Sequence, residues 1–230
     1  MTINTVERID DWVAVRHVLI SVSDKAGLDR LIPELLSINP NIRMLSTGGT
    51  FARIREILGD RADSVLTQVS DYTGQPETQG GLVKTLDFKI YLGLLTETYN
   101  PSHEADLART ESIPIDMVVV NLYPFGQTVA RSDVTAEMAR GNIDIGGPCM
   151  IRAAAKNFLR VAPVVDPDDY PEILKTLRSN KGSLSLETRY RLARKAFAHT
   201  AAYDKAISIY LSNLPFDEVR RCYRMTSETS

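Results

Sequence analysis

Residues 16–36 read "RHVLISVSDKAGLDRLIPELL" and hold one complete unit of an α/β fold. The run "RHVLIS" is typical of a buried strand, and after "VSDK" apolar side chains recur at the spacing of one helix face. That face consists of Leu28, Leu31, Ile32, Leu35 and Leu36. Ser23 is predicted to cap the start of this helix. A buried strand followed by an amphipathic helix predicts a parallel sheet covered by helices.

The same alternation continues along the chain. A second strand is expected at "IRMLS" (42–46), and Phe51, Ile54 and Leu58 mark the inner face of the helix after it. Further strands are expected at "SVLTQV" (64–69), "IYLGLL" (90–95), "IDMVVVNL" (115–122) and "VAPVV" (161–165). Further helices are expected at 101–112, 134–140, 149–157, 168–179 and 185–212. No linker or internal repeat splits the chain, so we predict one α/β fold, a parallel sheet flanked by helices with a helical C-terminal extension that either packs on the sheet or forms a small lobe.

The composition argues against several classes of partner. The 230-residue chain has a formal net charge of −2, which offers no general attraction to nucleic acid or to an anionic membrane, so a small ligand is expected. Its two cysteines, Cys149 and Cys222, are too few for a disulfide framework and lack a metal-binding spacing. We therefore expect no metal and a cytoplasmic protein. The sequence shows neither a signal-peptide pattern nor an apolar run of membrane-spanning length.

In a parallel sheet of this kind, ligands bind outside the carboxyl ends of the strands, so the loops there are the candidate site. The first loop, "SVSDK" (21–25), offers Ser21, Ser23 and Lys25 beside the start of a helix, where unpaired N–H groups and the helix dipole favour a phosphate. The second loop, "STGGT" (46–50), places hydroxyls and glycine N–H groups in the same position. It matches neither the Walker pattern nor the dinucleotide fingerprint. Two such loops on successive units favour a phosphate site.

Two later loops add polar side chains. Asn121 and Tyr123 directly follow a predicted strand and are expected to face the crevice, although a tyrosine that anchors a turn fits equally well. In "NIDIGGPCMIRAAAKN" (142–157), Asp144 precedes a Gly-Gly-Pro start of a helix. An aspartate and a lysine in one site can share proton transfer. Spacing alone does not prove that Asp144 and Lys156 meet, because Lys156 lies about two turns beyond the helix start, and a lysine on a helix is usually solvated.

The stretch "GGLVKTLDFK" (80–89) places Lys84 and Thr85 after a glycine pair. Glycines let the backbone approach a ligand, and a Lys-Thr step can hold an anion. An ordinary turn before a buried strand accounts for the same residues. The stretch alone therefore does not distinguish a binding loop from a structural turn.

A family resemblance rests on long motifs that occur in order: "SVSDKAGL", "STGGT", "VSDYTG", "VKTL", "VVVNLYPF", "NIDIGGPCMIRAAAKN" and "SLETRYRLARKAFAHTAAYD". From about Arg16 to about Leu211 the chain resembles the IMP cyclohydrolase domain, which is the N-terminal domain of the bifunctional purine biosynthesis proteins. The resemblance implies a methylglyoxal-synthase-like fold. It also implies an N-terminal extension at 1–15, the cyclohydrolase-like domain at 16–212 and a polar C-terminal tail at 213–230.

The same resemblance implies an activity and a site. The activity is the dehydrating closure of formamidoimidazole carboxamide ribonucleotide to IMP, without metal or organic cofactor. The implied substrate-binding residues are Ser23, Asp24, Lys25, Thr47, Gly48, Gly49, Thr50, Thr85, Asn121 and Ile145, and the implied catalytic residues are Lys156, Asp144, Lys84 and Tyr123. Asp144 would orient or deprotonate the amide, and Lys156 would protonate the departing oxygen. Lys84 would stabilise negative charge with support from Tyr123, and the two lysines are interchangeable in these roles.

The chain departs from the family pattern around "VKTL". Leu82 replaces an arginine, Asp87 and Phe88 replace His-Pro, and Tyr91 replaces a histidine. Loss of one charge-assisted hydrogen bond to a ligand costs about 1.5–3 kcal/mol, which weakens a site without abolishing it. Asp87 is also close enough in sequence to pair with Lys84, which has little effect if the pair is exposed.

Two other functions therefore stay open. The first is a purine-nucleotide-binding or regulatory module that binds the ligand without turnover. The second is a methylglyoxal-synthase-type lyase, which rests on fold analogy. His17 and His103 lie outside the proposed loops, and His199 is interpreted as structural, so the lyase is disfavoured. The resemblance further leads us to expect a homodimer and a separate formyltransferase.

Overall fold

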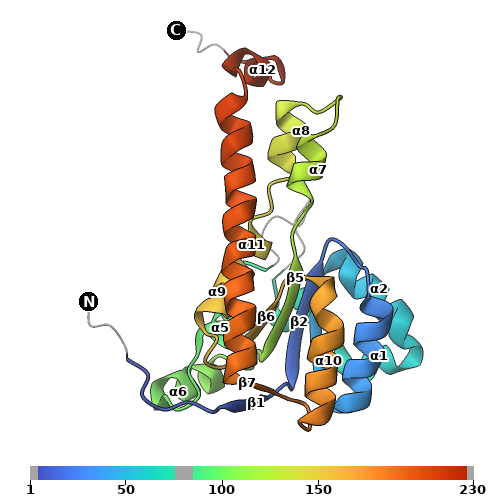
Figure 1. Ribbon diagram of the computed structural model, residues 1–230, viewed down its shortest axis with the longest axis vertical. Coiled ribbons are helices and arrows are strands. Elements are labelled where there is room, and N and C mark those ends of the chain that lie inside the picture. Colours follow the sequence, from blue (N-terminus) through green and yellow to red (C-terminus); the bar gives the residue numbers. More distant parts are fainter. Residues whose placement is uncertain (1–4, 76–84, 227–230) are drawn as a thin grey trace.

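The computed structural model describes residues 5–75 and 85–226. Its centre is a five-stranded sheet in which all neighbouring strands are parallel (Figure 1). Across the sheet the strands are β4 (Leu66–Gln68), β3 (Arg43–Ser46), β2 (His17–Val22), β5 (Met117–Asn121) and β6 (Ala162–Val164). The predicted α/β fold with a parallel sheet is confirmed. Because the strands are parallel, their carboxyl ends meet at one edge of the sheet.

Both faces of the sheet are buried, which is why its strands are continuous apolar runs. On one face, Val119 of β5 lies opposite Ile20 of β2 and Val164 of β6, and all three are in the same apolar cluster. This face is covered by α1 (Leu28–Ile38), α2 (Gly48–Leu58) and α10 (Tyr170–Ser179). The other face is covered by α5 (Phe88–Leu95), α9 (Gly146–Lys156) and the first half of α11 (Leu186–Asn213). The sheet is thus the middle of three layers.

Shorter elements complete the described part of the chain. They are β1 (Trp12–Ala14), β7 (Ser183–Ser185), η1 (Gly59–Arg61), α3 (Ala62–Val65), α4 (Val69–Thr73), α6 (Pro101–Arg109), α7 (Phe125–Val129), α8 (Ala136–Gly141), η3 (Pro167–Asp169) and α12 (Phe216–Arg221). β1 pairs antiparallel with β7, which joins the segment predicted as an N-terminal extension to the rest of the fold. α12 lies within the segment predicted as a polar tail.

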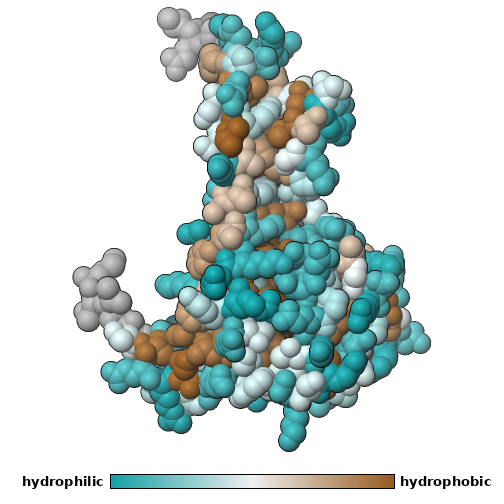
Figure 2. Space-filling view, viewed as in Figure 1, coloured by the Kyte–Doolittle hydropathy of each residue, from teal (hydrophilic) through white to brown (hydrophobic). Residues whose placement is uncertain are grey.

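α11 extends beyond the sheet and forms a projecting arm together with α7, α8 and α12 (Figure 1). At 28 residues it is about 42 Å long, which exceeds the length of any strand in the sheet. The sequence left open whether the C-terminal helix packs on the sheet or forms a small lobe. In the structure its first half packs on the sheet and its second half belongs to the arm. Hydrophobic side chains are visible on this arm in Figure 2; the exposed ones include Ile209, Leu211, Phe216, Tyr223 and Met225.

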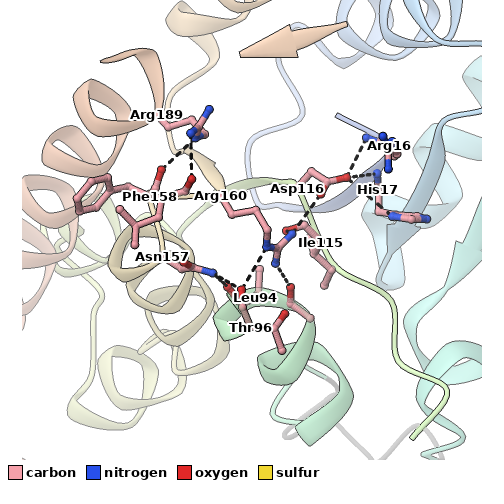
Figure 3. Close-up of polar contacts among 12 residues, drawn as sticks. Arg16, His17, Leu94, Thr96, Ile115, Asp116, Asn157, Phe158, Arg160 and Arg189 are labelled. Atoms are coloured by element: carbon pink, nitrogen blue, oxygen red, sulfur yellow. Dashed lines mark hydrogen bonds and ion pairs between the residues drawn. The ribbon is translucent and has the colours of Figure 1, made fainter. Parts of the chain in front are cut away.

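Arg160 connects several elements at the edge of the sheet opposite the strand carboxyl ends (Figure 3). Its guanidinium is buried, pairs with Asp116 Oδ1 at 3.1 Å, and donates to the carbonyls of Gly93, Thr96 and Ile115. Asp116 in turn accepts the main-chain N–H groups that lead into β2 at 2.9 Å. The pair thus fixes the end of α5 against the starts of β2 and β5.

The strand predicted at 90–95 is wrong, because residues 88–95 form α5. Asp87 caps this helix by accepting the N–H of Lys89 at 2.7 Å, and Ile90, Gly93 and Leu94 are buried at helical spacing. A short apolar run does not distinguish a strand from a buried helix.

Ser23 is not the predicted cap of α1. The helix starts at Leu28 after Gly27, with no side-chain cap. The N–H groups of Ser23 and Asp24 are instead bonded to Asn121 Oδ1 at 2.7 and 2.9 Å, which holds these residues in a loop.

Other predicted elements differ at their ends. β4 is shorter than 64–69 because Ser64 and Val65 close α3, and the helix expected from residue 149 begins at Gly146. Within the described ranges, no helix is both long and apolar enough to cross a bilayer. The same residues contain no group of three or more His, Cys, Asp or Glu side chains placed to hold a metal ion.

Candidate functional site

A pocket of about 360 Å³ lies at the carboxyl ends of β2, β3 and β5. Its size is in the range of small-molecule sites. It brings together predicted residues from five separate loops: Ser23, Lys25, Thr47, Gly48, Gly49, Thr50, Thr85, Asn121, Tyr123, Asp144 and Ile145. The loops meet because parallel strands end at one edge of the sheet. The pocket therefore lies where the sequence predicts it.

The second loop presents the start of α2 to the pocket. Gly48 has a φ of 46°, a conformation that favours glycine, and its N–H and that of Gly49 lie in the first helical turn, where no intrahelical acceptor is available. Lys25 lies beside this turn, with Nζ 3.9 Å from the position that a Cβ on Gly49 would occupy. First-turn N–H groups and a lysine together favour an anion such as a phosphate.

Hydroxyl groups in the first two loops join the loops to each other. Thr50 Oγ1 accepts the N–H of Val22 and donates to its carbonyl, both at 3.0 Å. Ser21 Oγ and Thr47 Oγ1 are 2.9 Å apart. Thr50 is thus used to fix the shape of the pocket, and its hydroxyl has no proton left for a ligand.

Asn121 also acts on the protein itself. Its Oδ1 accepts two N–H groups of the first loop, and its Nδ2 donates to the carbonyl of Asp24 at 2.8 Å. The amide therefore sets the conformation of the loop that carries Lys25. One N–H of the Asn121 amide remains for a ligand, so the predicted binding role and this structural role are compatible.

The start of α9 forms the opposite wall, with Asp144 placed over it. Asp144 Oδ1 accepts the N–H of Gly147 at 2.8 Å. A Cβ on Gly147 would lie 2.6 Å from Asp144 Oδ2, and one on Gly146 would lie 2.3 Å from Thr85 Oγ1. The two glycines therefore allow Asp144 and Thr85 to approach the helix closely. The wall combines a carboxylate with the N–H of Gly146, because the N–H of Gly147 is bonded to Asp144 and Pro148 has none.

Burial raises the pKa of Asp144 above its ordinary value, and the main-chain N–H groups of Gly147 and Tyr123 oppose that rise by stabilising the carboxylate. Tyr123 itself is half exposed at the mouth of the pocket, as is Ile145. A carboxyl whose pKa is moved towards neutrality is better matched to proton transfer than an exposed aspartate.

Among the described residues, two predicted ones are not part of this pocket lining, and a third predicted residue is not described. Asp24 is exposed, and its Oδ1 accepts the N–H of Ala26 at 2.9 Å, which shapes the first loop. Lys156 is exposed at the last position of α9, about 15 Å along the helix from its start. Lys84 lies outside the residues that the structure describes. The geometry therefore brings Asp144 to the pocket without Lys156.

The residues that depart from the family pattern have mostly structural surroundings. Asp87 is buried, caps α5 and accepts from Gln75 Nε2 at 2.7 Å. Phe88 is 60% exposed. Tyr91 packs against the apolar cluster beside α9, and burial raises the pKa of its phenol. Leu82 lies outside the described residues. The proposed pairing of Asp87 with Lys84 also falls outside them.

Sequence reasoning missed several pocket residues. Ile143, Met150 and Gly141 line the pocket but carry no polar group that would mark them as functional. Met150 could have been found from its apolar spacing on α9, although that spacing indicates a core position equally well. Tyr203 on α11 lies next to the pocket wall, where its hydroxyl accepts the N–H of Asp144 and donates to the carbonyl of Asn142. Nothing local in the sequence links residue 203 to residue 144.

Two family models match adjoining parts of the chain. The MGS-like domain model matches residues 30–149, and the AICARFT/IMPCHase bienzyme model matches residues 154–229. The first covers α2, the strands β3, β4 and β5 and the start of α9, and therefore most of the pocket, although β2 and the loop that carries Lys25 precede it. The second covers the end of α9, α10, α11 and α12.

Curated relatives and a solved structure are similar over most of the chain. The bifunctional purine biosynthesis protein PurH of Synechococcus sp. (strain WH7803) is 48% identical over 197 residues, and that of strain CC9311 is 47% identical. Each alignment covers 86% of this chain and 36% of the relative, so the chain spans about a third of those proteins' length. The crystal structure of ForH superposes with a TM-score of 0.70 at 33% identity, covering 84% of this chain and 97% of that chain.

Proposed function

The chain belongs to the MGS-like domain family, and from this premise we propose that it is an IMP cyclohydrolase of purine biosynthesis. It would close formamidoimidazole carboxamide ribonucleotide to IMP. The names of the curated relatives and of the second family model support a role in purine biosynthesis. Those relatives are bifunctional and longer than this chain, so the assignment to ring closure rests on the site.

The observation that carries the proposal is the meeting of two different helix starts in one pocket. The start of α2, with Lys25 beside it, suits the 5′-phosphate of a ribonucleotide. The start of α9, with Asp144 over it, suits a reacting group that exchanges a proton and develops negative charge. One pocket thus offers a phosphate position and a reaction position.

Ring closure requires little beyond positioning and proton transfer. The carboxamide nitrogen attacks the formyl carbon, and a C–N bond forms while the formyl oxygen takes up negative charge. The tetrahedral adduct then loses that oxygen as water. The two protons of the water come from the carboxamide nitrogen and from the formamido nitrogen. No electrons are transferred to or from another molecule.

Each described pocket group has a role in this scheme. Asp144 orients the carboxamide and removes its proton, and the N–H of Gly146 at the start of α9 stabilises the oxyanion. Lys25 and the start of α2 hold the phosphate. Tyr123 lies at the mouth of the pocket, where it would contact the purine ring or the departing oxygen. The roles of Lys84 and Lys156 as proton donor and charge stabiliser stay predictions.

A second function is favoured by the place of Lys156. Because that lysine is exposed at the far end of α9, the described pocket lining lacks one of the two predicted catalytic lysines, and the other, Lys84, lies outside the described residues. A purine-nucleotide-binding module without turnover would need the α2 phosphate position and no proton donor. The two functions differ in whether IMP is formed.

The test is to add the formylated ribonucleotide to the purified chain and follow IMP. Asp144→Asn should lower kcat by about a hundredfold to ten-thousandfold, the usual effect of losing a general base. Lys25→Ala should raise KM by about tenfold to a hundredfold, since a charge-assisted hydrogen bond contributes about 1.5–3 kcal/mol. Lys175→Ala, which removes an exposed lysine from α10, is the matched control.

Lys156→Ala separates the two lysine hypotheses. A loss of turnover at unchanged KM would make Lys156 the proton donor despite its position, and unchanged turnover would remove it from the mechanism. IMP binding by calorimetry without IMP formation would favour the binding module. If the chain neither binds IMP nor forms it, both functions are excluded.

The proposal implies a supplier of the formylated substrate. A formyltransferase has to provide it, either on a separate protein, as the sequence leads us to expect, or on a further part of a longer chain. The homodimer stays a prediction, and sedimentation of the purified chain would test it.

A further inference from the structure

Tyr203 on α11 is in contact with the main chain that carries Asp144 into the pocket. The N–H of Asp144 donates to the Tyr203 hydroxyl at 2.8 Å, and that hydroxyl donates to the carbonyl of Asn142 at 3.3 Å. A phenol has one proton to give and can accept in return, so both bonds are made by the same oxygen. Tyr203 therefore binds the segment from both sides of Ile143.

The ring of Tyr203 contacts the start of the helix that follows the Tyr123 loop. Phe125 is buried, and its ring meets that of Tyr203 edge to face with centroids 6.2 Å apart. Phe125 starts α7, and its N–H donates to the carbonyl of Tyr123 at 2.8 Å. One side chain on α11 thus connects the loop that carries Asp144 with the loop that carries Tyr123.

We propose that Tyr203 is a positioning residue, which holds Asp144 at the place where it meets the substrate. Asp144 is fixed at two points: its carboxylate by the N–H of Gly147, and its main-chain N–H by the Tyr203 hydroxyl. Without the second contact the carboxylate could still bond to Gly147, but the loop beneath it would move relative to the pocket. The proposal rests on the proposed function in that Asp144 is the general base.

The comparisons place Tyr203 in the part of the chain that an MGS-like domain does not account for. The match to that family ends at residue 149, whereas Tyr203 lies in the segment matched by the bienzyme model. Most of the pocket lining, including Asp144, lies in the segment that the MGS-like model matches. The hydroxyl that positions Asp144 comes from the second segment. We infer that α11 adapts the common pocket to the reaction of this protein.

Tyr203→Phe tests the proposal because it keeps the ring on Phe125 and removes both hydrogen bonds. Tyr210→Phe is the matched control. Tyr210 also lies on α11 and packs edge to face on Phe125, with centroids 5.8 Å apart, and within the described residues its hydroxyl makes no hydrogen bond. Tyr210→Phe therefore measures any general effect of removing a tyrosine hydroxyl from this helix.

The first readout does not depend on the reaction. The carboxyl of Asp144 is titrated by ¹³C NMR in protein labelled at aspartate, with the resonance assigned from the spectrum of Asp144→Asn. Tyr123, Tyr203 and Asp204 are the other titratable groups that face this contact. In Tyr203→Phe the looser loop admits water, so Asp144 should titrate at lower pH than in the native protein and in Tyr210→Phe. Coincident titrations of native protein and Tyr203→Phe would overturn the proposal.

The second readout separates positioning from binding. Tyr203→Phe should lower kcat by about tenfold, which corresponds to about 1.4 kcal/mol, because Asp144 loses its second point of attachment, and should leave KM within about twofold. Tyr210→Phe should leave both unchanged. An active protein in which Tyr203→Phe keeps its kcat would overturn the proposal. If the native chain forms no IMP, the proposed function fails, and the NMR titration still decides whether Tyr203 positions Asp144.

Discussion

Asp144 is under two opposing influences that act on a single carboxyl group. Burial disfavours its charged form, whereas the N–H groups of Gly147 and Tyr123 favour it, and burial is the larger effect. In the unfolded chain the same group has the ordinary aspartate pKa of about 3.9. Because the pKa is higher in the folded protein, charging Asp144 works against folding.

This difference predicts a pH dependence of stability. Between the unfolded pKa and the raised folded pKa, the folded protein binds more protons, so the free energy of unfolding falls as pH rises through that window. Asn at position 144 cannot titrate and still accepts from Gly147. The stability of Asp144→Asn relative to the native protein should therefore rise with pH above about pH 4 and then level off. Urea unfolding at a series of pH values measures this, and parallel pH curves would contradict it.

The close packing around Gly147 predicts that a larger residue there destabilises the protein. A Cβ there would lie 2.6 Å from both Asp144 Oδ2 and Leu122 Cδ2, closer than any van der Waals contact. Gly147→Ala should destabilise the protein by about 1–3 kcal/mol, the usual cost of overpacking. Gly126→Ala is the control, because nothing lies within 4 Å of its Cβ position in α7, and it should be neutral or stabilising by up to about 1 kcal/mol. Equal urea midpoints for both variants would show that the site has room at Gly147.

At the scale of elements, α5 depends on Arg160. The buried guanidinium donates to Asp116 and to carbonyls at the end of α5 (Figure 3). Arg160→Met should cost about 3–5 kcal/mol, because it leaves a buried carboxylate without its charge partner. Adding Asp116→Asn to Arg160→Met should recover part of that loss. The pair lies at the opposite edge of the sheet from the pocket, so ligand affinity of the folded variants should not change.

α5 also shows which part of the fold could be predicted from the sequence. The unit at 16–36 could be predicted because its strand and its helix have clear periods of their own. "IYLGLL" has too few residues to show a period, and what makes it a helix is a cap at Asp87 and a buried contact between Gly93 and Arg160. Both depend on residues outside the run, and the second is 67 positions away.

The site follows the same rule. Loops at the ends of parallel strands could be expected to meet, and the structure brings Lys25, Asp144 and their neighbours to one pocket. Lys156 was expected in the site because it matches a family motif. It is the last residue of α9, whereas the pocket is at the first turn, and the rise of the helix separates these two positions by about 15 Å. Tyr203 could not be placed from the sequence, because its partner lies 59 positions earlier.

At the scale of the whole molecule, α11 connects the sheet, the pocket and the arm. Arg189 fixes the N-terminal end of this helix. This guanidinium is 1% exposed and donates to five main-chain carbonyls. They belong to Asp10, Asp11, Phe158, Leu159 and Leu184. Burial lowers the pKa of Arg189 to about 10, which leaves it charged at neutral pH. The N-terminal segment, β7 and the chain after α9 are thus joined to α11 by one side chain.

Arg189→Lys should loosen the N-terminal segment and leave the pocket intact. An ammonium group has three donors, so at least two carbonyls lose their bond, and the loss should be on the order of 3 kcal/mol because each bond to a charged group contributes about 1.5–3 kcal/mol. Trypsin should then cleave after Arg8 faster than in the native protein, while nucleotide affinity stays the same. Arg191→Lys, two positions further on α11, is the control, since the exposed pair of Arg191 with Glu172 contributes at most about 1 kcal/mol and a lysine keeps the positive charge that lies 4.0 Å from Asp169. Cleavage at the same rate in both variants would mean that the segment is held by the β1–β7 pairing instead.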